Sequence, residues 1–282
     1  MILTKNLKIN PVLLTNIVFG FFPISFIFGS VMLNVNLLLF CCLGIYYLKS
    51  KILTTKFDFS IKIIFLFFFI LFFSTSLSFV KTLYFEGYDN INISLTQLTK
   101  SILFFRFFLL LLAIYALIEL NIINYKHFFV SAALCSILIS ADLVFQYVFG
   151  FNIIGLESYV SHNTSFFADE LIAGSYVQNF AFFSIMFFVY KFRNSENYFR
   201  YTLISFLIIL LSFGIMISGN RMPVILFLLG IFLIYIFNKK LRKIALANFV
   251  IFFLVLGTLI SSDNYWKTSY TSFFQRTVLT VT

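Results

Sequence analysis

Long apolar stretches separated by short polar clusters dominate the pattern of this chain. A membrane-spanning helix needs about 20 consecutive apolar residues, and windows of that length predict about nine spans here. The predicted spans cover residues 11–30, 32–48, 60–80, 101–118, 128–149, 172–190, 201–218, 222–237 and 244–260. Only Asn34 and Asn36 separate the first two, which form either a tight hairpin or one kinked unit. The pattern predicts an all-α polytopic transmembrane helix bundle, with a membrane domain over residues 1–260 and a short non-cytoplasmic tail over 261–282.

Composition excludes a soluble globular domain. Apolar residues make up 61% of the 282 residues and charged residues only 11%. In a soluble domain about a quarter of all residues are charged. We therefore expect membrane lipids to surround most of the surface. No GxxxxGK, HExxH, GxSxG or CxxC pattern occurs, so nothing supports a nucleotide-driven pump or a zinc protease. We expect neither a metal nor a cofactor.

The distribution of charge predicts the orientation. With a cytoplasmic N-terminus, fourteen of the 20 basic residues fall in inside segments and five in outside segments. This is the asymmetry of the positive-inside rule, and the reversed topology would violate it at nearly every loop. We predict a bacterial inner (plasma) membrane protein with a periplasmic C-terminus. Because the basic residues are dispersed in short loops, we expect no nucleic-acid partner.

Two charged residues, Arg106 and Asp142, lie well inside predicted spans rather than near their ends. Such residues cost about 2.5–3.5 kcal/mol at the bilayer centre, so they are retained where they pair or line a polar cavity. Gln146 lies one helical turn from Asp142 on the same face, and Arg106 falls between them in height. An antiparallel helix pair can bring the three together, either as a structural ion pair or as the wall of an outward-facing polar cavity.

Two outer segments carry further candidate chemistry. Asp169 and Glu170 immediately precede a span, where acids complement the positive end of a helix. They serve either that purpose or a binding site, although adjacent helical positions point apart. Arg221 follows a tight Ser-Gly-Asn turn and faces the outer side, which disfavours positive charge. Its guanidinium suits bidentate capture of a phosphate or pyrophosphate, while the alternative is an interfacial anchor.

Three segments in this order resemble the superfamily of O-antigen polymerases and O-antigen ligases. They are ADLVFQYVFGFNIIG (141–155), SFFADELIAGSY (165–176) and ISGNRMPVILFLLG (217–230), which together span about a third of the chain. Members of that family show an Asp–Gln helix, an acidic loop that ends in Gly-Ser-Tyr, and a Ser-x-x-Arg turn that opens a Leu-rich span.

The resemblance implies an integral membrane glycosyltransferase of lipopolysaccharide biosynthesis that needs no cofactor. Such enzymes polymerise or ligate surface polysaccharide carried on undecaprenyl diphosphate at the periplasmic face. It also implies that Arg221 contacts the diphosphate and that Asp169 and Glu170 shape the donor or acceptor site. Arg106, Asp142 and Gln146 complete the predicted substrate-binding set. The catalytic residue stays unassigned, with His162 as the one candidate for a general base on the outer side.

Several alternatives remain open. The family continues past its ninth span into a large periplasmic loop and further helices, and this chain ends at Thr282. We therefore expect either a partner chain that supplies a C-terminal region or a truncated, inactive form. A polysaccharide transporter or flippase is another class, for which inverted repeats or broken helices are expected. A non-catalytic membrane subunit is the third.

Overall fold

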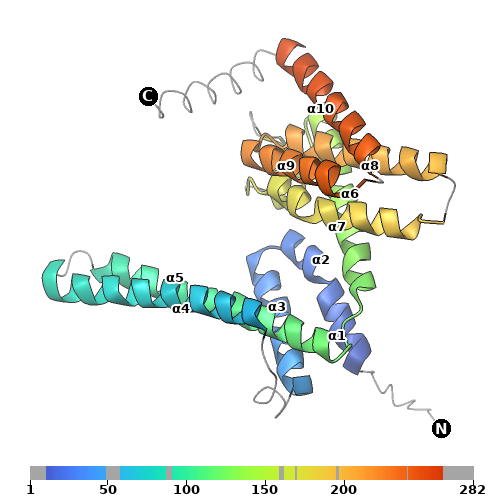
Figure 1. The fold of residues 1–282 in the computed structure, drawn as a ribbon. Helices are drawn as coiled ribbons and strands as arrows, with labels where there is room; N and C mark the ends of the chain where they lie inside the picture. The colour runs from blue at the N-terminus through green and yellow to red at the C-terminus, as the bar shows by residue number, and fades with distance from the viewer. Residues whose placement is uncertain are drawn as a thin grey trace, which may run out of the picture. The chain divides into compact units, whose positions relative to one another are not determined.

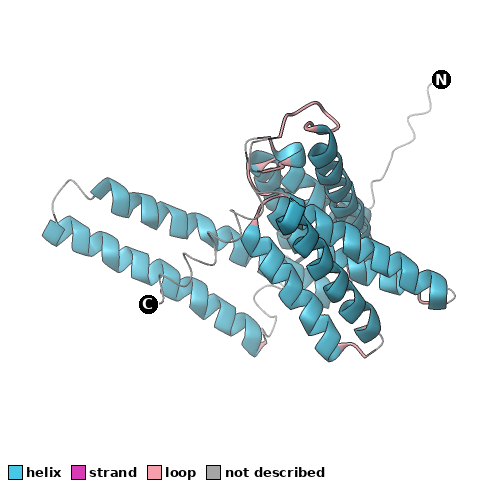
Figure 2. Cartoon of the chain, turned by 90° about the horizontal axis from the view of Figure 1, so that it is seen from above, coloured by secondary structure: helices cyan, strands magenta, loops and turns pink. Residues whose placement is uncertain are grey.

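The structure, a computed structural model, describes residues 11–48, 58–86, 91–158, 162–168, 170–194, 197–239 and 241–262. These residues form helices joined by loops and contain no strand (Figure 2), apart from one isolated bridge between Phe151 and Glu157. The predicted all-α class is therefore confirmed. The elements are α1 (Pro11–Gly20), α2 (Phe22–Ile27), α3 (Ser30–Leu48), α4 (Phe59–Lys81), the π-helical turn η2 (Thr82–Glu86), α5 (Ile91–Glu119), α6 (Tyr125–Phe149), the 3₁₀ turn η4 (Ser165–Phe167), α7 (Ala173–Lys191), α8 (Asn197–Ile217), α9 (Arg221–Phe237) and α10 (Arg242–Ser262).

Within the described residues, five helices are long and apolar enough to cross a membrane. They are α3, α4 with part of η2, α5, α6 and α8, and the shorter α9 is also apolar. Large apolar side chains remain exposed along them, such as Phe67, Ile70 and Phe73 of α4. Apolar side chains in such numbers are stable only in lipid or against another protein. The protein is therefore membrane-associated, while the count of nine spans is not confirmed.

The first predicted span, 11–30, differs most from the prediction. It is divided into α1, with 10 residues, and α2, with 6. A helix of 10 residues is about 15 Å long, half of the hydrocarbon thickness. Pro23 in the first turn of α2 has no N–H to continue the preceding helix. Gly29, with φ +91°, then turns the chain before α3 begins.

The chain divides into two compact units, Met1–His127 and Phe128–Thr282. In the first unit, α4 and α5 form an antiparallel pair whose helices lie side by side (Figure 1). Thr75 and Ser101 join them through a hydrogen bond of 2.8 Å between their hydroxyls. The Phe68 ring packs against Phe104 and Phe108, with centroids 5.2 and 5.6 Å away. The pair is thus held by aromatic packing around one polar contact.

In the second unit, α7 and α8 run antiparallel beside α9 and α10. The buried core of this unit contains Leu143 of α6 together with Ile185, Leu211 and Phe227, none more than 1% exposed. Small residues let α6 and α8 approach closely, because a Cβ on Gly214 would lie 2.9 Å from the Ser140 Cβ. Close contacts of small residues are the usual way in which helices pack in membranes, where the hydrophobic effect does not drive helices together.

Candidate functional site

Four buried polar residues of the second unit, Asp142, Gln146, Ser165 and Ser218, lie where α6 and α8 end and in the loop before α7. Asp142 is fully buried, and its carboxyl group accepts two hydrogen bonds. The Ser165 hydroxyl donates to Oδ2 at 2.6 Å, and the Ile153 amide donates to Oδ1 at 2.9 Å. Both donors come from the loop between α6 and α7. Asp142 therefore ties this loop to the end of α6.

Gln146 binds the same loop one helical turn further along α6. Its Oε1 accepts a hydrogen bond of 2.9 Å from the Ser165 amide. Its Nε2 donates to the carbonyl oxygen of Leu156 at 3.4 Å. Asn152 completes the arrangement, because its Nδ2 donates to the Ser165 carbonyl at 2.7 Å. All three hydrogen-bonding groups of Ser165 are thus paired, each with a different side chain.

The backbone around Ser165 is unusual. Ser165 has φ +53° and Ala168 has φ +48°, a region that residues other than glycine rarely adopt. Such a conformation persists only where the surroundings enforce it. At Ser165 the two hydrogen bonds donated to Asp142 and Gln146, and the one accepted from Asn152, supply that constraint. The loop is therefore held in a defined shape rather than lying loosely over the helix ends.

A second set of contacts joins this loop to the turn between α8 and α9. The His162 Nδ1 lies 3.3 Å from the Ser218 carbonyl oxygen. Asn163 Nδ2 donates to the Ile217 carbonyl at 3.0 Å. Asn220 Nδ2 donates back to the carbonyl of Leu171 at 2.8 Å. We call the described parts of loop 150–172, together with turn 218–221, the loop–turn site.

Gly174 explains how the start of α7 can lie so close to this turn. A Cβ at this position would overlap with the Ser218 hydroxyl and would lie 3.3 Å from the Asn220 Cβ. Only glycine permits this approach without moving α7 or the turn. Gly219 has φ +80° and lets the chain reverse between α8 and α9. The turn therefore has the left-handed glycine expected from its sequence.

Arg221 is the first residue of α9 and is half-buried. Asn220 precedes it as N-cap, and Pro223 lies in the first turn of α9. The first amides of a helix lack intrahelical acceptors, and the helix dipole places partial positive charge there. Together with the guanidinium of Arg221, these amides make a local environment that favours a phosphate or a carboxylate.

Of the other predicted site residues, Glu170 is exposed on the loop, and its amide donates to the Phe167 carbonyl at 2.9 Å. Asp169 lies outside the described residues. Arg106 belongs to α5 in the first unit, so its pairing with Asp142 would join two units and stays a prediction. Its guanidinium lies 4.9 Å from the centroid of the Phe107 ring, and its Nε is buried with no hydrogen-bond partner among the described residues.

Sequence reasoning missed Asn152 and Ser165, which hold the loop. Asn152 is fully buried, and its Oδ1 accepts from the Leu156 amide at 2.7 Å and from the Ile154 amide at 3.1 Å. An Asn two residues after Gly150 was a local signal for such a turn, because Asn side chains commonly bond the backbone that follows. Nothing in the sequence near Ser165 indicated its contact with Asp142.

The loop–turn site therefore presents an arginine at a helix start, a histidine and an acidic side chain on an ordered loop. Thr164 is also buried there, and its hydroxyl has no partner among the described residues. Within the described part of the chain, no group of three or more His, Cys, Asp or Glu side chains could hold a metal ion. The site's arginine and helix-start amides suit anion binding, and its histidine suits proton transfer.

No protein family model, no curated protein and no solved structure matches this chain. The resemblance to O-antigen polymerases and ligases therefore rests on the three sequence segments alone.

Proposed function

We propose that the protein is a membrane glycosyltransferase of the O-antigen polymerase or ligase type, acting on glycans carried by undecaprenyl diphosphate. The observation that carries this proposal is the meeting of the three resembling segments at one end of the second unit. Asp142 of the first segment bonds Ser165 of the second. Asn220 of the third segment bonds Leu171 of the second. Residues up to 78 positions apart thereby contribute to one site.

Arg221 is proposed to bind the diphosphate. When the glycosidic bond to the carrier breaks, negative charge builds up on the departing diphosphate and needs a cation nearby. The guanidinium and the first amides of α9 are fixed donors that meet this need. No metal has to be invoked for this part of the reaction.

The acceptor hydroxyl needs a base as it attacks the sugar. His162 is the proposed candidate, because its Nδ1 faces the Ser218 carbonyl, which can only accept a hydrogen bond. A proton on Nδ1 leaves Nε2 unprotonated and able to accept the hydroxyl proton. Glu170 and Asp169 would help to shape the acceptor or donor pocket.

We further propose that the loop–turn site faces the periplasm. The opposite ends of α7, α8, α9 and α10 carry a basic cluster of Lys191, Arg193, Arg200, Lys239, Arg242 and Lys243. Basic residues concentrate on the cytoplasmic side of bacterial membrane proteins. This separation of charge supports an inner-membrane protein with a cytoplasmic N-terminus.

The test is complementation of a strain that lacks its own copy, with Arg221→Lys compared with Arg200→Lys. Lysine keeps the charge but cannot form the bidentate contact. We expect Arg221→Lys to abolish the ladder of surface glycan at unchanged membrane levels. Arg200, at the opposite end of α8, should tolerate the same change. A normal ladder from Arg221→Lys, or none from the unaltered protein, would overturn the proposal.

A polysaccharide flippase is the second candidate, and the division of the first predicted span into α1 and α2 favours it. Transporters place interrupted helices at their substrate sites. The two functions differ in where lipid-linked repeat units accumulate when the protein is missing. Accumulation on the outer leaflet supports the glycosyltransferase, and accumulation on the inner leaflet supports the flippase.

A further inference from the structure

A groove of about 830 Å³ runs between α8 and α10, at the end of the second unit opposite the loop–turn site. Its volume lies in the range of small-molecule binding sites. Tyr198, Phe206, Lys239 and Lys243, which line it, are exposed, so the groove opens on the outside of the unit. The lining residues are Tyr198, Tyr201, Thr202, Ser205, Phe206, Ile209, Lys239, Lys243, Ile244 and Ala247.

The polarity of the groove changes along its length. Lys239 and Lys243 lie in the turn before α10 and in its first turn, beside the Tyr198 end of α8. Phe206 and Ile209 lie two to three helical turns further along α8, roughly 12–16 Å away at 1.5 Å per residue. The groove therefore offers two cations at one end and an apolar wall at the other.

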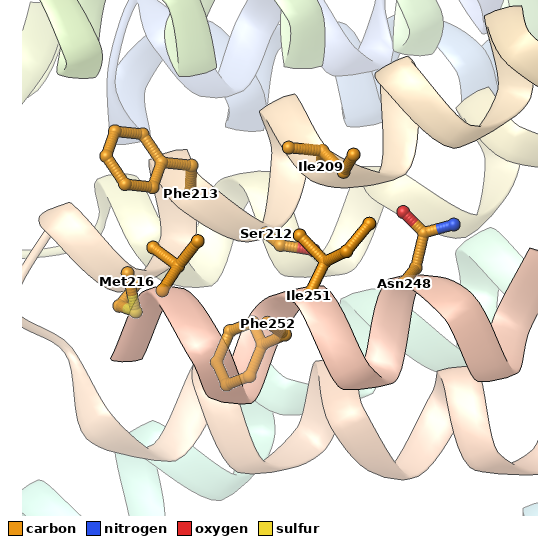
Figure 3. Close-up of a pocket in the computed structure, with 8 residues that line it drawn as sticks. Ile209, Ser212, Phe213, Met216, Asn248, Ile251 and Phe252 are labelled. Carbon is orange, nitrogen blue, oxygen red and sulfur yellow. The ribbon is translucent and has the colours of Figure 1, made fainter. Parts of the chain in front are cut away.

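A narrow cavity of about 20 Å³ continues beyond the groove, and Ile209 lines both (Figure 3). Asn248 of α10 lies at one end of this cavity and Met216 of α8 at the other. Asn248 is buried, and its Nδ2 donates to the Ser205 hydroxyl at 2.9 Å. Its Oδ1 has no partner among the described residues. Beyond the groove, α8 and α10 thus leave a small space between them.

Other cations at this end have structural partners. The Arg200 guanidinium donates to the Arg193 carbonyl at 3.1 Å and lies 4.9 Å from the Tyr201 ring centroid. Arg242 donates to the Tyr235 carbonyl at 3.0 Å. Lys239 and Lys243 instead line the groove, and none of the residues lining it is acidic. Among the described residues, these two lysines are therefore the cations that line the groove and can meet an anion that enters.

The chemistry of the groove selects the kind of anion. A free phosphate would use the lysines but would leave the wall of Phe206 and Ile209 without a partner. An anionic lipid fits both ends of the groove. Its phosphate can lie at the lysines while its acyl chains lie along the apolar wall. Tyrosines such as Tyr198 and Tyr201 commonly lie at the level of lipid headgroups, and basic pockets between membrane helices bind lipid phosphates.

We propose that this groove binds an anionic phospholipid of the membrane, with its phosphate between Lys239 and Lys243 and an acyl chain along Phe206 and Ile209. The site lies at the other end of α8 from the loop–turn site and does not depend on the proposed glycosyltransferase function. Its lipid would hold α8 against α10 where they are not in full contact. The bound phospholipid would therefore stabilise the second unit.

The experiment measures binding of phosphatidylglycerol to the purified full chain in detergent by native mass spectrometry. The double variant Lys239→Gln/Lys243→Gln should bind about 30-fold more weakly, at about 1 kcal/mol per lysine near a membrane surface. Lys239→Arg/Lys243→Arg should bind normally. The control Lys126→Gln/Lys191→Gln removes the same charge outside the groove and should bind as the unaltered protein does.

A second variant tests the shape of the groove. Ala247→Phe keeps both lysines but fills the space between α8 and α10, and it should weaken phosphatidylglycerol binding at least about tenfold by overpacking. Equal binding of phosphatidylcholine, full competition by inorganic phosphate, or an equal loss in the control variant would overturn the proposal. Normal binding by Ala247→Phe would also overturn it, because the lysines alone would then suffice.

Discussion

Asp142 provides the sharpest test of how the loop–turn site is held. In Asp142→Ala, the Ser165 hydroxyl and the Ile153 amide both lose their acceptor. An unsatisfied buried donor costs about 1–3 kcal/mol. The Ser165 hydroxyl is fully buried, whereas the Ile153 contact is only partly buried and recovers part of its loss from solvent. We expect the local stability of loop 150–172 to fall by about 2–4 kcal/mol.

Hydrogen–deuterium exchange in detergent measures this loss directly, because amide exchange reports local opening. A loss of about 2–4 kcal/mol raises exchange about 30-fold to several hundred-fold. The increase should be confined to the described parts of loop 150–172, including the amides of Ile153 and Ser165. The helices α8 and α10 should exchange at the rates of the unaltered protein, since neither bonds to Asp142 in the structure.

The matched control is Ser140→Ala, two residues away on α6. Ser140 is fully buried like Asp142, but its hydroxyl has no partner among the described residues. Removing it should change loop exchange little, because no hydrogen bond is lost. Asp142→Ala and Ser165→Ala should also be non-additive, since they remove the same contact. Equal effects of the Asp142 and Ser140 variants, or unchanged exchange in Asp142→Ala, would refute the assignment of Asp142 as the anchor of the loop.

Three further experiments probe the packing within each of the two units. Gly174→Ala should destabilise the second unit by about 1–3 kcal/mol in an SDS unfolding titration, because the added methyl group overlaps the neighbouring turn. The control Gly257→Ala should be neutral or stabilising, because a Cβ there has nothing within 4 Å. A double-mutant cycle between Ser136 and Ser184, whose hydroxyls lie 2.6 Å apart, should give a coupling of about 0.6 kcal/mol, and a value near zero would contradict the contact. Asn16→Ala removes two hydrogen bonds to the loop before α6. The local stability of that loop should fall by about 1–3 kcal/mol, and proteolysis of the loop should become faster.

Much of the fold could be predicted because membrane helices are encoded locally. Runs of apolar residues placed α4 and α6 to α10 within a few residues of their observed bounds, whereas α5 begins at Ile91, ten residues before the predicted span. The same local reasoning predicted the turn before α9, since Gly219 adopts positive φ and Arg221 opens the helix. It did not anticipate the break between α1 and α2, where Pro23 interrupts a window that is apolar throughout.

The candidate site was only partly predictable. The spacing of Asp142 and Gln146 placed both on one face of α6, and both bond Ser165 in the structure. The prediction named Arg106 as their partner, whereas the partner found within their own unit is a loop serine 23 residues from Asp142. The charge of Asp142 suggested an arginine partner, but one hydroxyl and one backbone amide donate to its two carboxyl oxygens in the structure.

The sequence by itself indicated that the protein lies in a membrane, and it gave the approximate positions of most of its helices. Each of these follows from local composition, because every helix in a bilayer satisfies its own backbone and needs only an apolar surface. The tertiary structure decided which groups the buried polar side chains meet. Ile153 and Ser165 reach Asp142 of α6 only after the loop has folded back on that helix, and no local pattern specifies that return.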